Sequence, residues 1–375
     1  MISDPGLASW LQLTLTPGLG ASAIRNMLRQ FGLPQAVLAR RRGDLAAFAS
    51  PGAIEALDSQ DVRDGVSRAL DWASRPDRFI VTLADEGYPR ALLEIADPPP
   101  LLYAQGRPEL LQRTSLAVVG SRNATAQGER NAEDFARALG AAGLSIVSGL
   151  ALGIDAAAHR GGLATASSTI AVLGTGIDIV YPRRNTELAA EIAARGLLVS
   201  EFPLRTPAAA HNFPRRNRLI SGLSRGCLVV EAALASGSLI TARSAADQGR
   251  EVFAIPGSIH SPLSKGCHAL IKSGAKLVES ADDVLAELAG FRPSAYASTA
   301  ASTAASTAAS TATAVEAAGL LAHMGHDPID VDALCVRAGM SADQVSSELL
   351  RLELDGRVTA LPGGLYQRLE KASGG

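Results

Sequence analysis

Residues 116–125 read Leu-Ala-Val-Val-Gly-Ser-Arg-Asn-Ala-Thr, a short apolar run that ends in a turn of small and polar residues. Similar apolar runs, each followed by Gly, Ser, Pro or Glu, recur at 144–147, 169–173, 197–200, 227–230 and 251–255. Helical patterns separate these runs, and such alternation is typical of a parallel sheet covered on both faces. The sequence therefore predicts an α/β domain with an extended Rossmann-like parallel sheet. Residues 80–83 and 101–103 are candidates for additional strands in front of it.

Composition divides the 375 residues into several domains. Residues 1–75 have a helical pattern, and the Thr-Pro-Gly-Leu-Gly turn at 16–20 is similar to that of a helix-hairpin-helix or SAM-like unit, which either contacts DNA phosphates or only packs. Residues 78–290 form the predicted Rossmann-like domain. Residues 291–314 are an Ala/Ser/Thr stretch that can bury little apolar surface to offset its ordering entropy, which predicts a flexible linker.

Residues 315–375 are predicted to form a winged-helix domain. One helix is expected to begin within 328–335, and a second to follow Ser341 as its N-cap. Residues 357–361 and 365–368 flank a Pro-Gly-Gly turn as the two strands of a wing. The second helix carries Asp343, Glu348 and Glu353 against Arg351 alone, so an auxiliary or protein-contact role is favoured over readout of a major groove.

Bulk properties limit the classes of function. The formal net charge is −2, so any site for nucleic acid must be a local cluster of cations. The three cysteines, Cys227, Cys267 and Cys335, are far apart, which argues against disulfides and a structural metal site. Residues 1–15 lack the pattern of a signal peptide, and no apolar run reaches the ~20 residues of a membrane helix. We therefore expect a cytoplasmic protein without metal.

Ligands of parallel α/β sheets bind beyond the carboxyl ends of the strands. Small residues there allow backbone N–H groups to approach an anion, and we interpret four such turns as a phosphate-binding rim. The alternative is that these glycines only make tight turns between strand and helix. No dinucleotide fingerprint and no Walker A loop is present, so no cofactor is expected. The residues expected at the rim are Gly120, Ser121, Arg122 and Thr125; Ser148, Gly149 and Gly153; Gly174, Gly176, Arg183, Arg184 and Asn185; and Ser236, Gly237 and Ser238.

Residues 211–222 read His-Asn-Phe-Pro-Arg-Arg-Asn-Arg-Leu-Ile-Ser-Gly, with a proline suited to the first turn of a helix. Cations in that turn are disfavoured by the helix dipole and by one another, which a polyanion would relieve. An aromatic side chain beside arginines suits single-stranded nucleic acid, because a base can stack on it. The alternative is a buried phenylalanine beside solvated arginines. The candidate DNA-binding residues of this segment are Phe213, Arg215, Arg216, Asn217 and Arg218, which would join Arg122, Arg183 and Arg184 in one patch of arginines.

The ordered series of motifs resembles the DNA processing protein A (DprA/Smf) family. Its blocks are Gly-Ser-Arg-Asn-Ala-Thr at 120–125, Ser-Gly-Leu-Ala-Leu-Gly-Ile-Asp-Ala-Ala-Ala-His at 148–159, and Gly-Thr-Gly-Ile-Asp at 174–178 with Tyr-Pro-Arg-Arg-Asn at 181–185; then come Phe-Pro-Arg-Arg-Asn-Arg-Leu-Ile-Ser-Gly-Leu-Ser at 213–224, Val-Val-Glu-Ala-Ala-Leu-Ala-Ser-Gly-Ser-Leu-Ile-Thr-Ala-Arg at 229–243, and Val-Phe-Ala-Ile-Pro-Gly at 252–257. The resemblance implies a non-enzymatic protein that binds and protects single-stranded DNA in natural transformation and loads the RecA recombinase. It also implies a homodimer through the Rossmann-like domain. DNA contacts carry over to Arg122, Arg215, Arg216 and Arg218, with Phe213 beside them, whereas the lysine that some relatives have before this block is absent from 208–211.

Two other classes remain open. A Rossmann-like nucleotide hydrolase of the LOG (lysine decarboxylase-like) type would bind phosphates at the same edge, and Asp155, His159 and Glu231 could supply its acid and base. The expected Pro-Gly-Gly-x-Gly-Thr block of that type is missing, and Asp155 and His159 could instead cap or bond locally. A regulator that binds duplex DNA through the winged helix is the third class.

Overall fold

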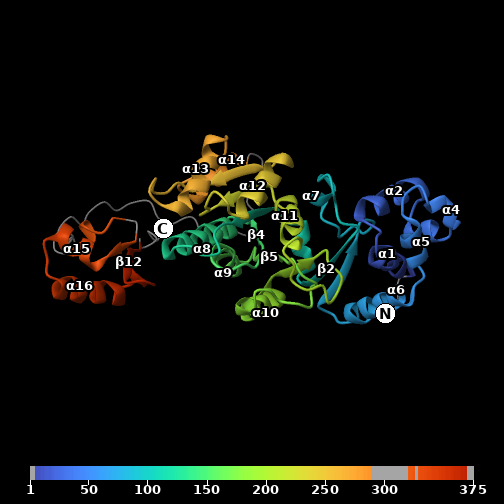
Figure 1. Ribbon diagram of the computed structural model, residues 1–375, viewed down its shortest axis with the longest axis horizontal. Helices are drawn as coiled ribbons and strands as arrows, with labels where there is room; N and C mark the ends of the chain where they lie inside the picture. Colours follow the sequence, from blue (N-terminus) through green and yellow to red (C-terminus); the bar gives the residue numbers. More distant parts are fainter. Residues whose placement is uncertain (1–4, 289–319, 326–327, 370–375) are drawn as a thin grey trace.

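The computed structural model describes residues 5–288, 320–325 and 328–369. Figure 1 shows three parts in a row, with the N-terminal helices at one end, the sheet in the middle and the small C-terminal domain at the other end. The predicted linker at 291–314 lies outside the described residues. In the part of the chain that is described, no helix is both long and apolar enough to cross a membrane.

The N-terminal part is helical, as predicted. Its helices are α1 (Pro5–Leu15), α2 (Ala21–Phe31), α3 (Pro34–Leu38), α4 (Arg42–Leu45), α5 (Pro51–Ala56) and α6 (Gln60–Ala73). The turn at 16–20 joins α1 to α2, and Ser50 and Ser59 cap α5 and α6 through their hydroxyls. Trp72 of α6 packs edge-on against Tyr103 of the sheet, with 5.7 Å between ring centroids, so this domain is anchored on the sheet by apolar contact.

The central domain is built on one nine-stranded sheet in the order β1-β2-β6-β5-β4-β3-β7-β8-β9. Six strands match the predicted runs, and β1 and β2 match the two candidates; β9 was not predicted. Strand β1 pairs antiparallel with β2, and β2 with β6, whereas all other pairs are parallel. The strands are β1 (Arg78–Thr82), β2 (Leu101–Gly106), β3 (Ser115–Val119), β4 (Ser145–Ser148), β5 (Thr169–Val172), β6 (Leu197–Ser200), β7 (Gly226–Val229), β8 (Glu251–Ala254) and β9 (Lys276–Leu277).

Helices cover both faces of this sheet, which explains why its central strands are apolar throughout. Alternate residues of β3 enter opposite cores: Ala117 and Val119 pack towards α11, α12 and α13, and Leu116 and Val118 towards α8, α9 and α14. Helix α10 packs on the latter face beside α9. The helices are α7 (Arg90–Leu93), α8 (Ala126–Ala141), α9 (Ile154–Leu163), α10 (Thr186–Arg195), α11 (Asn212–Gly222), α12 (Ser238–Asp247), α13 (Lys265–Lys272) and α14 (Ala281–Glu287), with short 3-10 turns at Pro108–Gln112, Arg183–Asn185 and Pro262–Ser264.

The C-terminal domain has the predicted winged-helix layout, with one difference. Helix α15 (Val331–Ala338) is preceded by a short strand, β10 (Ile329–Asp330), where the sequence predicts helix only. Ser341 caps α16 (Ala342–Leu354) in a capping box with Gln344. The wing is the antiparallel pair β11 (Val358–Leu361) and β12 (Leu365–Arg368), and β10 pairs with β12 because its backbone groups need partners at that edge.

Candidate nucleic-acid interface

A cavity of about 830 Å³ opens at the carboxyl edge of the sheet, where Rossmann-like domains bind their ligands. It lies between the turns that follow β3 and β7 and the first turn of α11. Nine of the predicted site residues line it: Gly120, Ser121, Arg122, Phe213, Arg216, Asn217, Ser236, Gly237 and Ser238. We call this the carboxyl-edge cavity.

An aromatic pair with two arginines forms one wall of this cavity. The ring of Phe213 lies 5.6 Å from that of Tyr181, tilted by 40°. The guanidinium carbons of Arg122 and Arg216 lie 5.8 Å and 6.0 Å from the Phe213 centroid, within cation–π distance. Phe213 is half-buried, and Arg122 and Tyr181 are exposed. The wall thus offers a π-surface and a free cation to a ligand.

Sequence reasoning did not include Tyr181 among the site residues. Tyr181 lies in the segment after β5, immediately before the Pro-Arg-Arg-Asn run. It is 47% exposed, which is unusual for a large aromatic side chain. The sequence signal that could have identified Tyr181 as a site residue is its position beside these basic residues. Arg183 and Arg184 are exposed next to it but do not line the cavity.

Arg216 is a buried structural cation with one edge on the cavity. Its Nη1 donates to the backbone oxygens of Gly149, at 2.6 Å, and of Val172, so it joins the turns after β4 and β5. Burial lowers the pKa of Arg216 to about 10, with Asp155 opposing the shift and Arg122 adding to it. Arg216 is therefore mainly a structural residue of the site and contributes little to its accessible surface.

Several backbone N–H groups of the predicted rim are not free, because in the turns after β3 and β4 they donate to the protein's own side chains. Thr125 donates from its backbone N and its hydroxyl to the carboxylate of Glu231, at 2.9 and 2.6 Å. Gly149 donates to the carboxylate of Asp155 at 3.1 Å, and the ring of His159 accepts from the next amide. These amides therefore already have internal acceptors.

Burial disfavours the charged form of each of these internal groups, so it shifts the pKa values of the carboxyl groups and of the histidine in opposite directions. It raises the pKa of Asp155 and of Glu231, and it lowers the pKa of His159 to about 3. His159 is hence neutral and also contacts the Thr169 hydroxyl at 2.7 Å. Asp155, His159 and Glu231, the residues of the hydrolase alternative, each accept a hydrogen bond from a backbone amide of a turn, and Asp155 also lines the carboxyl-edge cavity.

Several remaining rim residues act through close packing or internal bonds. Gly153 has a φ of 71°, and a Cβ there would collide with the backbone oxygen of Ser121. A Cβ at Gly174 would lie 2.7 Å from the Phe213 ring, so the lack of a side chain at this position leaves room for the ring. The other contacts are Ser148 Oγ donating to Val118 O, Gly176 N donating to Thr206 O, and Asn185 Nδ2 donating to Leu150 O and Ala151 O.

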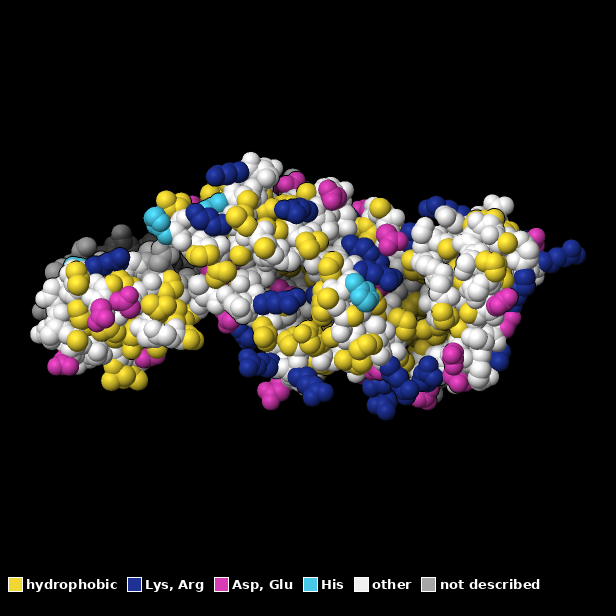
Figure 2. All heavy atoms as spheres, viewed as in Figure 1, with side chains coloured by type: hydrophobic (Ala, Val, Ile, Leu, Met, Phe, Trp, Pro, Cys, Tyr) yellow, Lys and Arg dark blue, Asp and Glu magenta, His cyan; other side chains and the backbone are white. Residues whose placement is uncertain are grey.

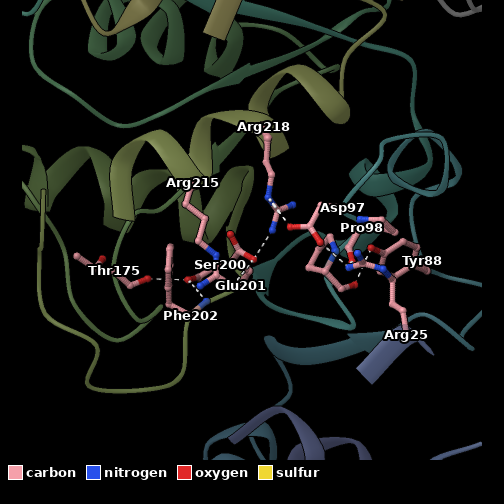
Figure 3. Close-up of polar contacts among 11 residues, drawn as sticks. Arg25, Tyr88, Asp97, Pro98, Thr175, Ser200, Glu201, Phe202, Arg215 and Arg218 are labelled. Atoms are coloured by element: carbon pink, nitrogen blue, oxygen red, sulfur yellow. Dashed lines mark hydrogen bonds and ion pairs between the residues drawn. The ribbon is translucent and has the colours of Figure 1, made fainter. Parts of the chain in front are cut away.

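Arg215 and Arg218 do not line the carboxyl-edge cavity, and Figure 3 shows them pointing towards the buried carboxylate of Glu201. Glu201 accepts from Arg218 at 2.5 Å and from Arg215 at 3.3 Å. Asp97 links Arg218, at 3.5 Å, to Arg25 of α2, at 2.6 Å. Burial raises the pKa of Glu201, and the two arginines of α11 oppose that shift. This charged chain ties the N-terminal domain to the helix that carries the site, so Arg218 has a structural partner that the sequence did not reveal.

The expected single patch of arginines is divided in the structure. Arg122 lines the cavity and has no carboxylate partner among the residues described, Arg216 is buried, and Arg215 and Arg218 face Glu201. On the face in Figure 2, basic side chains of the central domain are interspersed with hydrophobic and acidic ones. Over the described residues, no group of three or more His, Cys, Asp and Glu side chains is arranged to hold a metal ion.

Comparisons with known proteins show which family this chain resembles. Residues 79–289 match the family model described as "DNA recombination-mediator protein A", and residues 304–364 match that of the "DprA winged helix domain". The chain is 44% identical to Protein Smf of Escherichia coli, over 83% of this chain and 82% of that protein. It is 34% identical to Protein Smf of Synechocystis, over 96% and 98%.

Two solved structures are also similar. DNA processing protein A from Streptococcus pneumoniae superposes with a TM-score of 0.65 at 40% identity, covering 74% of this chain and 95% of that one. The protein from Helicobacter pylori, described with a "unique single-stranded DNA binding mode", has a TM-score of 0.51 at 30% identity, covering 56% and 95%.

The Rossmann-like domain with its winged helix thus defines a recombination mediator of the DNA-processing class. More narrowly, the chain belongs to the DNA processing protein A (DprA/Smf) family.

Proposed function

We propose that this protein binds single-stranded DNA at the carboxyl-edge cavity and does so without chemical conversion of the DNA. The observation that carries the proposal is the exposed Arg122 beside the paired rings of Phe213 and Tyr181. A cation can neutralise a phosphate, and an aromatic ring can stack on a base. In a duplex the bases are stacked on one another, so the aromatic contribution favours a single strand.

The wider role follows from the family. We propose that the bound strand is protected and handed to the RecA recombinase during natural transformation, and that the protein works as a homodimer through its Rossmann-like domain. The exposed edge strand β9, where Leu277 is 50% exposed, leaves backbone groups and apolar surface open for a second copy. The activity would take place in the cytoplasm, where a reducing environment suits the free cysteines Cys227, Cys267 and Cys335.

Fluorescence anisotropy with labelled oligothymidine and with a duplex of equal length tests the proposal. We expect tighter binding of the single strand and an affinity that falls with salt. Arg122→Ala should weaken binding, whereas Arg68→Ala, on the exposed face of α6, should not. Equal affinity for both nucleic acids, or an unchanged Arg122→Ala variant, would remove the proposed site. Release of free base from nucleoside monophosphates would instead favour the hydrolase.

A further inference from the structure

A second cavity, of about 690 Å³, lies at the opposite edge of the same sheet. Its lining residues stand immediately before three neighbouring parallel strands: Thr114 before β3, Arg225 before β7 and Arg250 before β8. We call it the amino-edge cavity. We propose that it binds a phosphate group, contributed by a second stretch of the DNA strand held at the carboxyl edge; this rests on the proposed function.

Four arginines converge on this cavity from separate segments of the chain: Arg90, Arg113, Arg225 and Arg250. Two carboxylates also line it, Glu251 and Glu287, and Glu287 is already paired with Lys276 at 2.5 Å. The lining is therefore net positive. Guanidinium groups match phosphate oxygens in geometry as well as in charge, which makes phosphate the ligand that fits.

The four arginines differ in how firmly they are held. Arg250 is fixed, because it is 8% exposed and bound to Glu94 at 2.8 Å and to the backbone oxygen of Ala91 at 3.1 Å. Arg113 is exposed and donates to the backbone oxygen of Ala166 at 3.3 Å. Arg90 and Arg225 are exposed, and neither has a carboxylate within 4.0 Å among the residues described. A rigid cation thus lies beside three that are available to a ligand.

A simpler explanation is that Arg225 and Arg250 only complement the negative ends of α11 and α12, which terminate a few residues earlier. That accounts for a cation after each of these α-helices, but Arg90 begins α7, where the helix dipole disfavours a cation, and Arg113 follows only the short 3-10 turn Pro108–Gln112. Arg250 is compensated by Glu94, but Arg90, Arg113 and Arg225 repel one another around one hollow, and a bound anion would remove that repulsion.

The lining also indicates which part of DNA would bind. No aromatic side chain is present among the described residues that line the amino-edge cavity, in contrast to the carboxyl-edge cavity. Contact would therefore be with the sugar–phosphate backbone and independent of base stacking. The five residues of β3 separate the two edges by about 16 Å, and a strand that engages both cavities must also pass around a layer of helices about 10 Å thick. A long strand can follow this path, whereas a strand of about six nucleotides that is held in the carboxyl-edge cavity cannot.

Salt-dependent binding of short and long single strands tests this inference. Labelled oligothymidines of about six and about forty nucleotides are titrated with the intact chain, the Arg113→Gln/Arg225→Gln variant and a charge-matched Arg68→Gln/Arg75→Gln control. The first variant should lower the salt slope for the long strand by about 1.4, since each phosphate contact on a single strand contributes about 0.7. Short-strand binding and the control should not change.

The outcomes separate the two proposals. An unchanged slope for the long strand, together with unchanged calorimetric binding of adenosine triphosphate, overturns the amino-edge site. Loss of triphosphate binding alone keeps the phosphate site and identifies a free nucleotide as its occupant. Loss of short-strand affinity on Arg122→Gln tests the carboxyl-edge cavity independently. Should circular dichroism show that the double variant is unfolded, Arg225→Gln alone, with an expected slope change of about 0.7, gives the same test.

Discussion

Replacing Phe213 separates base stacking from charge at the carboxyl-edge cavity. The ring packs on Gly174, pairs with Tyr181 at 5.6 Å and lies within 6.0 Å of two guanidinium carbons. Phe213→Leu keeps an apolar side chain of similar reach but removes the π-surface. Because stacking contributes about 1–3 kcal/mol per base, we expect a dissociation constant raised roughly 5- to 150-fold. No charge is removed, so the factor should be the same at every salt concentration.

Arg122→Gln provides the matched comparison, since it removes a cation and leaves the rings in place. Its salt slope should fall by about 0.7, whereas that of Phe213→Leu should equal that of the unmodified protein. Anisotropy titrations with oligothymidine at four salt concentrations measure both quantities. If Phe213→Leu binds with unchanged affinity while circular dichroism shows an intact fold, the ring does not stack on a base and the reasoning fails.

Three further perturbations have defined outcomes. Gly174→Ala places a Cβ 2.7 Å from the Phe213 ring, so single-strand affinity should drop without a change in salt slope, and unchanged affinity would show that the ring can move freely. Arg216→Ala leaves two backbone oxygens without a donor and Asp155 without its nearby cation, so urea unfolding should show a loss of about 3 kcal/mol or more; full stability would contradict the structural role. The pKa of His159 is about 3 in the folded chain, below the value of about 6.5 in the unfolded chain. Between these two pH values the unfolded chain binds a proton on His159 that the folded chain does not. The free energy of unfolding therefore decreases as the pH falls below about 6.5. Relative to His159→Gln, the protein should lose about 1.4 kcal/mol per pH unit below pH 6 in urea titrations, and a constant difference would refute the assignment.

Local patterns determined much of the architecture. Apolar runs followed by small residues identified six strands of the central sheet, because a strand buried on both faces must be apolar along its whole length. Ser341 marked the start of α16, since a helix needs acceptors for its first amides within a few residues. The aromatic and basic residues at 211–222 identified the helix that borders the cavity.

What the tertiary structure alone decided is which of these groups remains free for a ligand. The Thr125 amide in the turn after β3 donates to Glu231, 106 residues away, and Arg218 is paired with Glu201 and does not line the cavity. Such partners are brought together by the fold, and no local pattern encodes a hydrogen bond between distant segments. The sequence therefore determined the sheet edge and the kinds of side chain that gather there, while three-dimensional packing selected Arg122 and the two rings as its accessible surface.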